Sequence, residues 1–420
     1  MDLKSDQLLD VLSRLMNSPK NKKGQKTLQL QAKTIFDKVK LPKPKANGFD
    51  YVVFKPFYDA IASENGLDKL SIQIEKKENT IVFIDGVYQE TLSDAPCSIE
   101  KLSENGLFSP LTNKIGLETL SSSNNPFVSF NYALDSDGIF IRFNKDQQVK
   151  QPITIVNFLT ENKESNLSFR LHIHLAQNAK ASIYMLHQPL KANIPFNLLT
   201  HIQVEKNAQL ELIEKSQNNT LGLHQAFVEV KESGTFELKQ INFTPKLFRG
   251  DYTVKLKEMF ADAKLYGINI TQDQNQTHFF AEVQHLEEET TSYQQIKNMS
   301  FDHSRTSFEG KIFVDAKAQK TKAYQLNQNL VLSEKAANFS KPNLQILADD
   351  VKASHGATFA KLDEEELFYL QSRGVSEKEA KTMLTKSFVF EFLDLIENQD
   401  LKAELDQEIN LFLKRRLCEA

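Results

Sequence analysis

The chain has 420 residues, of which 40% are hydrophobic and 25% charged, the ordinary composition of a soluble, folded protein with two or three domains or one elongated domain. Lys and Arg (51) nearly balance Asp and Glu (55), so the net charge of −4 gives no sign of a nucleic-acid partner. Two cysteines allow neither a disulfide framework nor a CxxC…CxxC metal site, and no apolar run is long enough for a signal peptide or a membrane span. We therefore expect a cytoplasmic protein.

Residues 1–45 are predicted to form a helical segment. Four leucines between positions 8 and 15 recur at helical spacing, and "LQLQAKTIFDKVK" continues the pattern after a basic, glycine-containing break. The prolines and glycine of "LPKPKANG" end this segment, because they cannot continue a helix.

Residues 46–150 are predicted to mix helix and strand. "TIVFIDGVYQETLS" pairs two short β-rich runs around Asp85-Gly86, and "YALDSDGIFIRFN" repeats this arrangement around Asp137-Gly138. Asp-Gly between β-rich flanks is a strong hairpin signal, so we predict two hairpins.

Residues 151–361 are predicted to form a β-rich core with an internal repeat. "QNAKASIYML", "KNAQLELIEK", "ESGTFELKQI" and "ADAKLYGINI" share one pattern, with small residues at Ala179, Ala208, Gly234 and Ala263 and a fainter copy near Ala316. Short strands suit both a β-sandwich and a β-solenoid. The recurrence of roughly 26 to 29 residues favours the solenoid, in which each turn buries its apolar face against its neighbours.

Residues 362–420 are predicted to form a helical domain separate from the strands. Asp363 can cap a helix that Gly374 ends, and Ser376 with Glu379 can form the capping box of a second helix. The second helix carries an apolar face, and a third ends on Lys and Arg. The apolar face suits packing inside its own domain or docking to a partner. Its residues are Met383, Leu384, Phe388, Phe392 and Ile396.

Nucleotide-binding and hydrolase motifs (GxxxxGK[ST], GxGxxG after a strand, GxSxG and HExxH) are absent. His172 and His174 would share one face of a strand, where a structural role is favoured, and His278 and His285 could converge on a ligand only in a suitable fold. Glu287 to Glu289 suit a solvated loop. Asp349 and Asp350 suit a turn, because adjacent strand residues point to opposite faces and cannot form an acid/base pair.

His355 stands out in "LADDVKASHGATFAKLDEEELFYLQSRG". Its small neighbours should leave the imidazole accessible, and a neutral imidazole is a good metal ligand. A single histidine cannot hold a metal, so further ligands would have to come from another surface. An ordinary surface histidine remains the alternative at this point.

The block from "KIFVDAKAQ" through "KPNLQILADDVKASHGAT" to "LFYLQSRGVSEKEA" resembles the signature region of the SufB/SufD family, which assembles iron–sulfur clusters. The resemblance extends over roughly residues 150 to 395. It implies a right-handed parallel β-helix between helical terminal segments. Length and the lack of cysteines in the block make the chain most like the SufD members of the family. Those members are non-catalytic subunits that pair with SufB through the end of the β-helix and with the ATPase SufC.

The resemblance also implies roles for particular residues. His355 matches the family histidine that faces SufB and takes part in assembling a transient iron–sulfur cluster shared between the two subunits. Many relatives have cysteine where this chain has Ala353, so this subunit offers no thiolate there. The SufC-docking region corresponds to the C-terminal helices. We expect this region to involve Leu367, Phe368, Tyr369, Arg373 and Phe388.

The resemblance associates reduced flavin with the complex, although no residues specify a flavin site in this chain. Two copies are expected to be able to pair when the partners are missing. Two further hypotheses stay open: a SufB-like scaffold that assembles a cluster by itself, which the cysteine count disfavours, and a β-helix enzyme acting on polysaccharide. The enzyme is disfavoured because no acidic cluster follows the repeat.

Overall fold

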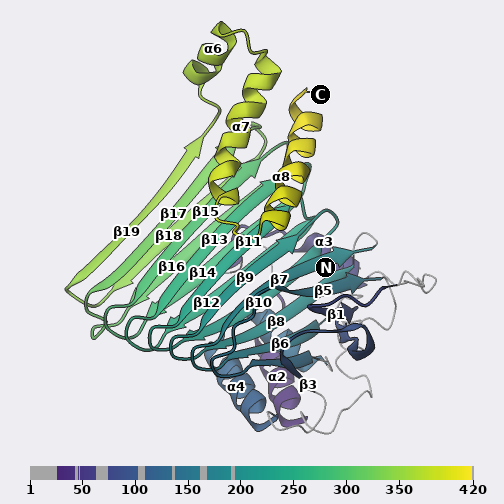
Figure 1. Ribbon diagram of the computed structural model, residues 1–420, viewed down its shortest axis with the longest axis vertical. Helices are drawn as coiled ribbons and strands as arrows, with labels where there is room; N and C mark the ends of the chain where they lie inside the picture. Colours follow the sequence, from purple (N-terminus) through teal and green to yellow (C-terminus); the bar gives the residue numbers. More distant parts are fainter. Residues whose placement is uncertain are drawn as a thin grey trace.

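The computed structural model describes residues 26–42, 46, 48–62, 74–102, 109–134, 138–160, 168–190 and 194–418. Two sheets form a parallel β-solenoid of about seven turns, with helices on both outer faces (Figure 1). From β4 onward, successive strands alternate between the sheets, so each turn contributes one strand to each. The predicted β-solenoid is confirmed.

We call the ten-stranded sheet sheet A and the nine-stranded sheet sheet B. In spatial order, sheet A consists of β19 (Val351–Ala360), β17 (Thr321–Val331), β15 (Thr291–Ser300), β13 (Asp262–Thr271), β11 (Thr235–Phe243), β9 (Gln209–Ser216), β7 (Lys180–Pro189), β5 (Ile153–Leu159), β1 (Thr80–Ile84) and β2 (Val87–Tyr88). Sheet B consists of β18 (Ala337–Ile346), β16 (Arg305–Val314), β14 (Gln276–His285), β12 (Leu247–Leu256), β10 (Leu221–Val230), β8 (Pro195–Val204), β6 (Ser168–Leu175), β4 (Gly138–Phe143) and β3 (Ser98–Lys101).

The core lies between the two sheets. Because strands of successive turns pair in parallel and in register, each inward-facing position forms a column along the solenoid. One such column contains the fully buried Ile183, Leu212, Leu238 and Leu265. Each turn therefore buries its apolar side chains against those of the next turn, which is why at least several turns are needed for stability.

The repeat prediction needs one correction in its phase. The first three small residues of the predicted pattern, Ala179, Ala208 and Gly234, align in one column. Register then places Ala261 in that column instead of Ala263, because Ala263 pairs with Phe236 on the neighbouring strand. The sequence "FADAKLY" offers alanine at both positions, and only the strand pairing distinguishes them.

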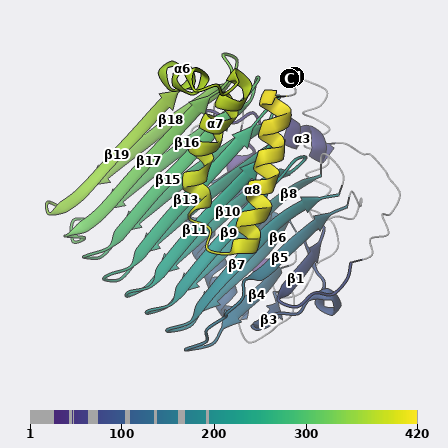
Figure 2. The same cartoon turned by 45° about the horizontal axis from the view of Figure 1, so that its top comes forward.

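Helices α2 (Lys26–Val39), α3 (Lys55–Ala62), α4 (Ser109–Ser122) and α5 (Pro126–Ala133) cover the outer face of sheet B (Figures 1 and 2). The predicted hairpin at Asp85-Gly86 is confirmed, since β1 and β2 pair antiparallel on either side of it. The predicted hairpin at Asp137-Gly138 is wrong. The residues before it form α5, which Asn125 caps and Pro126 begins, so only the second half of that motif is a strand.

Helices α6 (Glu364–Ser372), α7 (Glu377–Leu393) and α8 (Gln399–Leu413) follow the last strand. Asp363 accepts hydrogen bonds from the first-turn amides of α6, Gly374 follows the helix end with φ +87°, and Ser376 and Glu379 form the capping box of α7, all as predicted. A short π-helix, Lys414–Cys418, ends the described chain. No described helix is long and apolar enough to cross a membrane.

The prediction of a helical domain separate from the strands is wrong for α7 and α8. Both helices lie across the outer face of sheet A (Figure 2). Val389, Phe392 and Leu405 belong to one hydrophobic cluster with Ile241 and Ile268 of the sheet. The apolar face of α7 is thus covered by the solenoid, whereas Met383 at its start remains 52% exposed.

Candidate functional site

The solenoid ends openly at its C-terminal side. β18 and β19 each pair with a strand on one side only, so both sheets present an edge there. We call this end, formed by β18, β19 and the inward-facing residues of β17, the mouth. Edge strands leave backbone N–H and C=O groups without partners and are natural sites for association with another chain. Leu347 and Phe359 at the mouth are each 55% exposed.

His355 lies on β19, in register with Gln325 of β17. Ala353, two residues earlier, is in register with the fully buried Ala323 and packs against the cluster that contains it, so its side chain points between the sheets. Side chains two apart on a strand share a face, so His355 also points into the mouth. Its side chain is exposed, as predicted, because no further turn covers it.

Polar groups replace the apolar core near the mouth. The column of Leu238 and Leu265 continues as Gln294, Gln325 and finally His355. Both amide atoms of Gln294 and Oε1 of Gln325 are buried without a hydrogen-bond partner among the described residues. The same is true of Oδ1 of Asn338 and Oγ of Ser340. A buried polar atom left unpaired costs about 1–3 kcal/mol, and such atoms also occur along the rest of the solenoid, as in Gln225 and Thr277.

A second polar column runs along sheet A as an amide ladder. Nδ2 of Asn242 donates to Asn269 (2.7 Å), Asn269 donates to Asn298 (2.7 Å) and Asn298 donates to Asn329 (2.8 Å). Asn329 then donates to the main-chain carbonyl of Thr358 on β19 (3.0 Å). The ladder satisfies buried amides and ties the last strand to the turns behind it.

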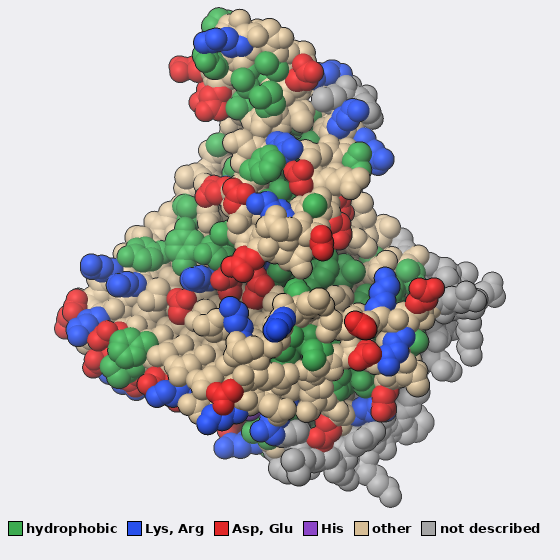
Figure 3. All heavy atoms as spheres, viewed as in Figure 1, with side chains coloured by type: hydrophobic (Ala, Val, Ile, Leu, Met, Phe, Trp, Pro, Cys, Tyr) green, Lys and Arg blue, Asp and Glu red, His purple; other side chains and the backbone are tan. Residues whose placement is uncertain are grey.

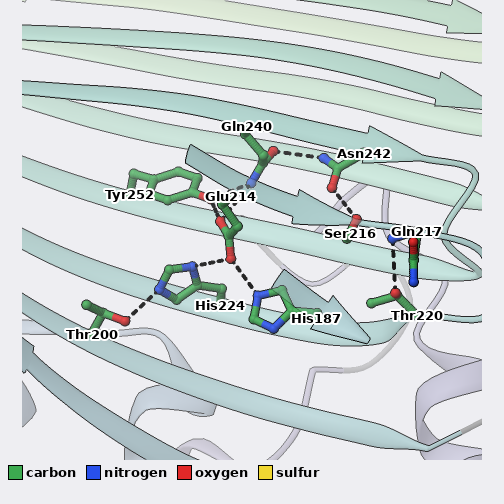
Figure 4. Close-up of polar contacts among 10 residues, drawn as sticks. All are labelled: His187, Thr200, Glu214, Ser216, Gln217, Thr220, His224, Gln240, Asn242 and Tyr252. Carbon is green, nitrogen blue, oxygen red and sulfur yellow. Dashed lines mark hydrogen bonds and ion pairs between the residues drawn. The ribbon is translucent and has the colours of Figure 1, made fainter. Parts of the chain in front are cut away.

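Deep in the solenoid, one carboxylate collects hydrogen bonds from three rings (Figure 4). Glu214 accepts from His187 Nε2 and His224 Nδ1, each at 2.8 Å, and from the Tyr252 hydroxyl at 2.5 Å. Burial opposes its ionisation, but the charges and hydrogen bonds of His224 and His187 hold the pKa of Glu214 well below its usual range. With its contacts filled by protein groups, this carboxylate stabilises the core and offers nothing to a ligand. Sequence analysis missed it, because its partners come from separate strands.

The other histidines singled out in the sequence do not form a site. His172 is buried and stacks on His201 with ring centroids 4.8 Å apart, while His174 contacts Glu205 at 3.4 Å. His278 and His285 lie near opposite ends of β14 and do not converge. His285 makes two hydrogen bonds of 2.8 Å to hydroxyl groups of Thr290 and Ser292. No described group of three or more His, Cys, Asp and Glu side chains could hold a metal ion.

Four of the predicted docking residues lie on or next to α6, which protrudes beyond the sheets and has no buried residue (Figure 3). Phe368 is 72% and Tyr369 57% exposed, Leu367 is half-buried, and the guanidinium of Arg373 lies 5.3 Å from the ring centre of Tyr369. Phe388 lies elsewhere, packed between α7 and sheet A. The structure therefore separates Phe388 from the other four.

Buried ammonium groups fasten α7 and α8 to sheet A. Nζ of Lys297 pairs with Glu391 and lies 4.5 Å from the ring centre of Phe388. Nζ of Lys215 pairs with Glu404 (3.0 Å) and Glu408 (2.8 Å) on α8. Burial alone would lower the pKa of Lys215, but the two carboxylates outweigh it and raise that pKa. Both helices are thus held by charge as well as by apolar contact.

Cys97 is the one cysteine whose side chain the structure describes. Burial raises the pKa of its thiol to about 12. A thiol that stays protonated at neutral pH is a poor nucleophile and a poor metal ligand. Cys97 therefore lacks the properties of a cysteine that receives sulfur.

The family model for the SUF system FeS cluster assembly SufBD core domain matches residues 158–388, more than half of the chain. The chain belongs to the SufB/SufD family. An iron–sulfur cluster assembly SufBD family protein of Synechocystis is 30% identical over 355 residues, which cover 79% of this chain and 77% of the relative. Iron–sulfur cluster assembly protein SufD of Escherichia coli is 26% identical over 338 residues, 77% of each chain. Iron–sulfur cluster assembly protein SufB of Bacillus subtilis is 24% identical over 308 residues, 71% of this chain and 63% of the relative.

The matched region runs from the strand before β6 into α7 and includes the mouth and α6. The predicted resemblance to the SufB/SufD family, most like its SufD members, is confirmed. This SufB/SufD protein is thus an iron–sulfur cluster assembly protein built on a β-solenoid.

Proposed function

We propose that the chain is the SufD-like subunit of a SufB–SufC–SufD scaffold complex and is not itself an enzyme. It pairs with SufB through the mouth and contributes His355 to a transient iron–sulfur cluster, which is the cargo of the complex. The observation that carries this proposal is the exposed His355, which points between the two sheets from an edge strand that pairs on one side only. The remaining ligands of the cluster then come from SufB, because the described side chains bring no thiolate to the mouth.

The protruding α6 supports docking of the SufC ATPase. Phe368 and Tyr369 present apolar rings to solvent on a helix that buries nothing, which is costly unless a partner covers them. Reduced flavin, if the complex uses it, would be held by the complex as a whole. Two copies of this chain would also be able to pair through their mouths without SufB. We place the protein in the cytoplasm, where thiols stay reduced.

The first test is co-expression with the cognate SufB and SufC, followed by anaerobic reconstitution with iron and sulfide. His355→Ala should leave the three-component complex intact but abolish the visible absorption of the cluster. The matched control is His303→Ala, which removes another exposed histidine from a turn of the solenoid. A normal cluster yield from His355→Ala would refute the role of His355, and failure of the wild type to form a complex would refute the partner assignment.

The docking surface has its own test. Phe368→Asp should weaken binding of SufC measured by calorimetry, whereas Leu30→Asp, on the 68% exposed Leu30 of α2, should leave it unchanged. Equal SufC affinity in the two variants would contradict docking through α6. Reconstitution of the isolated chain distinguishes the SufB-like alternative, which requires a stable cluster without partners.

A further inference from the structure

A stack of aromatic rings runs along the outer face of sheet B. Phe140, His172, His201 and Phe227 occupy neighbouring register positions on β4, β6, β8 and β10. Successive ring centroids are 6.3, 4.8 and 5.5 Å apart, and successive ring planes differ by at most 29°. Aromatic rings attract one another at these distances when they stack with an offset. The four rings therefore form one continuous column, which ends at Phe227.

The next register position after Phe227 holds no ring. Phe227 is in register with Thr253 of β12, and Thr253 is in register with Glu282 of β14. One face of the Phe227 ring lies against His201, so the opposite face is turned along the column toward Thr253. No other described ring stacks on Phe227. A short side chain thus stands where a further ring would continue the column.

A cavity of about 280 Å³ lies at this end of the column, between sheet B and α4. Its sheet side includes His201, Phe227 and Thr253, and its helix side includes Ile115 and Thr119. Sites for small molecules are concave, largely apolar and upward of about 300 Å³ in volume. The cavity is close to this lower limit, so its size suits a ligand of one or two rings with a short substituent.

One lysine of the cavity has no carboxylate partner. Among the charged side chains that line it, Lys257 pairs with Glu229 at 3.2 Å, and Lys114 lies 3.9 Å from Glu118. Lys255 makes no ion pair with a described carboxylate. It follows Thr253 by two residues on β12, so the two side chains share a face of the sheet. The lining therefore has one uncompensated positive charge beside the end of the column, which favours a ligand with an anionic group.

We propose that this cavity binds a small, flat aromatic molecule that carries an anionic group. The ring of the ligand stacks on the free face of Phe227 and continues the column over Thr253, while the anionic group lies toward Lys255. An aromatic carboxylate and a mononucleotide share this chemistry, and the experiment below distinguishes them. The site lies three strands before β18 in sheet B, away from the mouth, and does not depend on the role of His355.

Matched variants separate the ring and the charge from general packing. Phe227→Leu removes the ring face at the cavity but keeps an apolar side chain against the cluster of α2 and α4. Phe140→Leu removes a ring at the other end of the same column. Thr253→Phe fills the open position with a ring of the protein itself. Lys255→Gln removes the uncompensated charge, and Lys322→Gln removes the charge of an exposed lysine on sheet A.

The experiment is calorimetric titration of the isolated full chain with two probes, 2-naphthoate and adenosine 5′-monophosphate. We expect saturable binding of one molecule per chain, and the tighter probe identifies the source of the ligand. Phe227→Leu should weaken binding about 5-fold or more, as loss of a stacking ring does elsewhere. Thr253→Phe should abolish binding, and Phe140→Leu should match wild type. Lys255→Gln should weaken binding about 2- to 5-fold at low salt, whereas Lys322→Gln should leave it unchanged.

Three results would overturn the proposal. One is that neither probe binds the wild type saturably. Another is binding that survives Thr253→Phe, a variant that also decides the question if Phe227→Leu does not fold. The third is an equal loss in Phe227→Leu and Phe140→Leu, which would show a general effect on the sheet. Cluster yield does not enter this experiment, so failure of the proposed function would leave the binding result standing.

Discussion

Mild acid should destabilise this protein strongly, because its solenoid buries neutral histidines. Burial, together with the charge of Arg170, holds the pKa of His201 at about 3 and that of His172 well below its usual value. Burial has the same effect on His285, whose pKa is about 3, and on His278. In the native state these four rings stay neutral at pH 5.5, whereas in the unfolded chain they bind protons.

The magnitude follows from the linkage between proton binding and folding. With an unfolded pKa of about 6.5, each ring costs about 0.1 kcal/mol at pH 7.5 and about 1.4 kcal/mol at pH 5.5. Four rings therefore lower the free energy of unfolding by about 5 kcal/mol over this range. The sign is set by the depressed native pKa values: stability is complete above the unfolded pKa and is lost as the pH falls below it.

The assay is urea unfolding followed by circular dichroism between pH 5.5 and pH 7.5. A variant identifies the cause, since His285→Gln removes one of the four rings and should reduce the pH-dependent loss by about 1.4 kcal/mol. The control is Leu30→Ala, at a 68% exposed position of α2, which removes no titratable group and should leave the pH dependence unchanged. A free energy of unfolding that is level across this range would refute the reasoning, since it would mean that the rings are protonated in the native protein.

Three further predictions concern packing. Phe392→Ala, at a 2% exposed position between α7 and sheet A, should cost about 3–5 kcal/mol and speed amide hydrogen exchange in α7, as measured by mass spectrometry. Asn269→Leu breaks the amide ladder at both sides and should cost about 1–3 kcal/mol for each ladder neighbour left unpaired, measured by urea unfolding; a neutral result would show that the ladder adds no stability. Gly310→Ala places a Cβ 2.4 Å from the ring of Phe308 and should cost about 1–3 kcal/mol, whereas an unchanged melting temperature would contradict the crowding.

The parts of the fold that follow from local periodicity could be predicted from the sequence. Alternation in "KNAQLELIEK" places Leu210 and Leu212 on one face, and its recurrence indicates stacked turns. The capping box at Ser376 is a short-range signal, so the start of α7 could also be predicted from the sequence. The exposure of His355 followed from its small neighbours.

Other features depend on contacts between distant strands. The same alternation that buries Leu212 also buries Glu214, and the local sequence offers no partner for a buried carboxylate. The partners, His187 and His224, lie on the turns before and after and come beside it only in the folded solenoid. The sequence of α7 is apolar on more than one side, so it could not show that Val389 faces sheet A while Met383 faces solvent. The column that joins Gln294, Gln325 and His355 likewise becomes visible only when strand register is known.

The two ends of the solenoid are built differently, and this limits how large an assembly can grow. At the N-terminal end, the short strands β2 and β3 run antiparallel to their neighbours and terminate the parallel stack of each sheet. A rod with two open ends could add copies indefinitely and form a fibre, as heterologous contacts do when they fail to close. Here the last strand of each sheet at the N-terminal end is short and antiparallel to its neighbour, a form that disfavours pairing with a further copy at that end. Association through strand edges is therefore favoured at the mouth, which limits growth into a fibre.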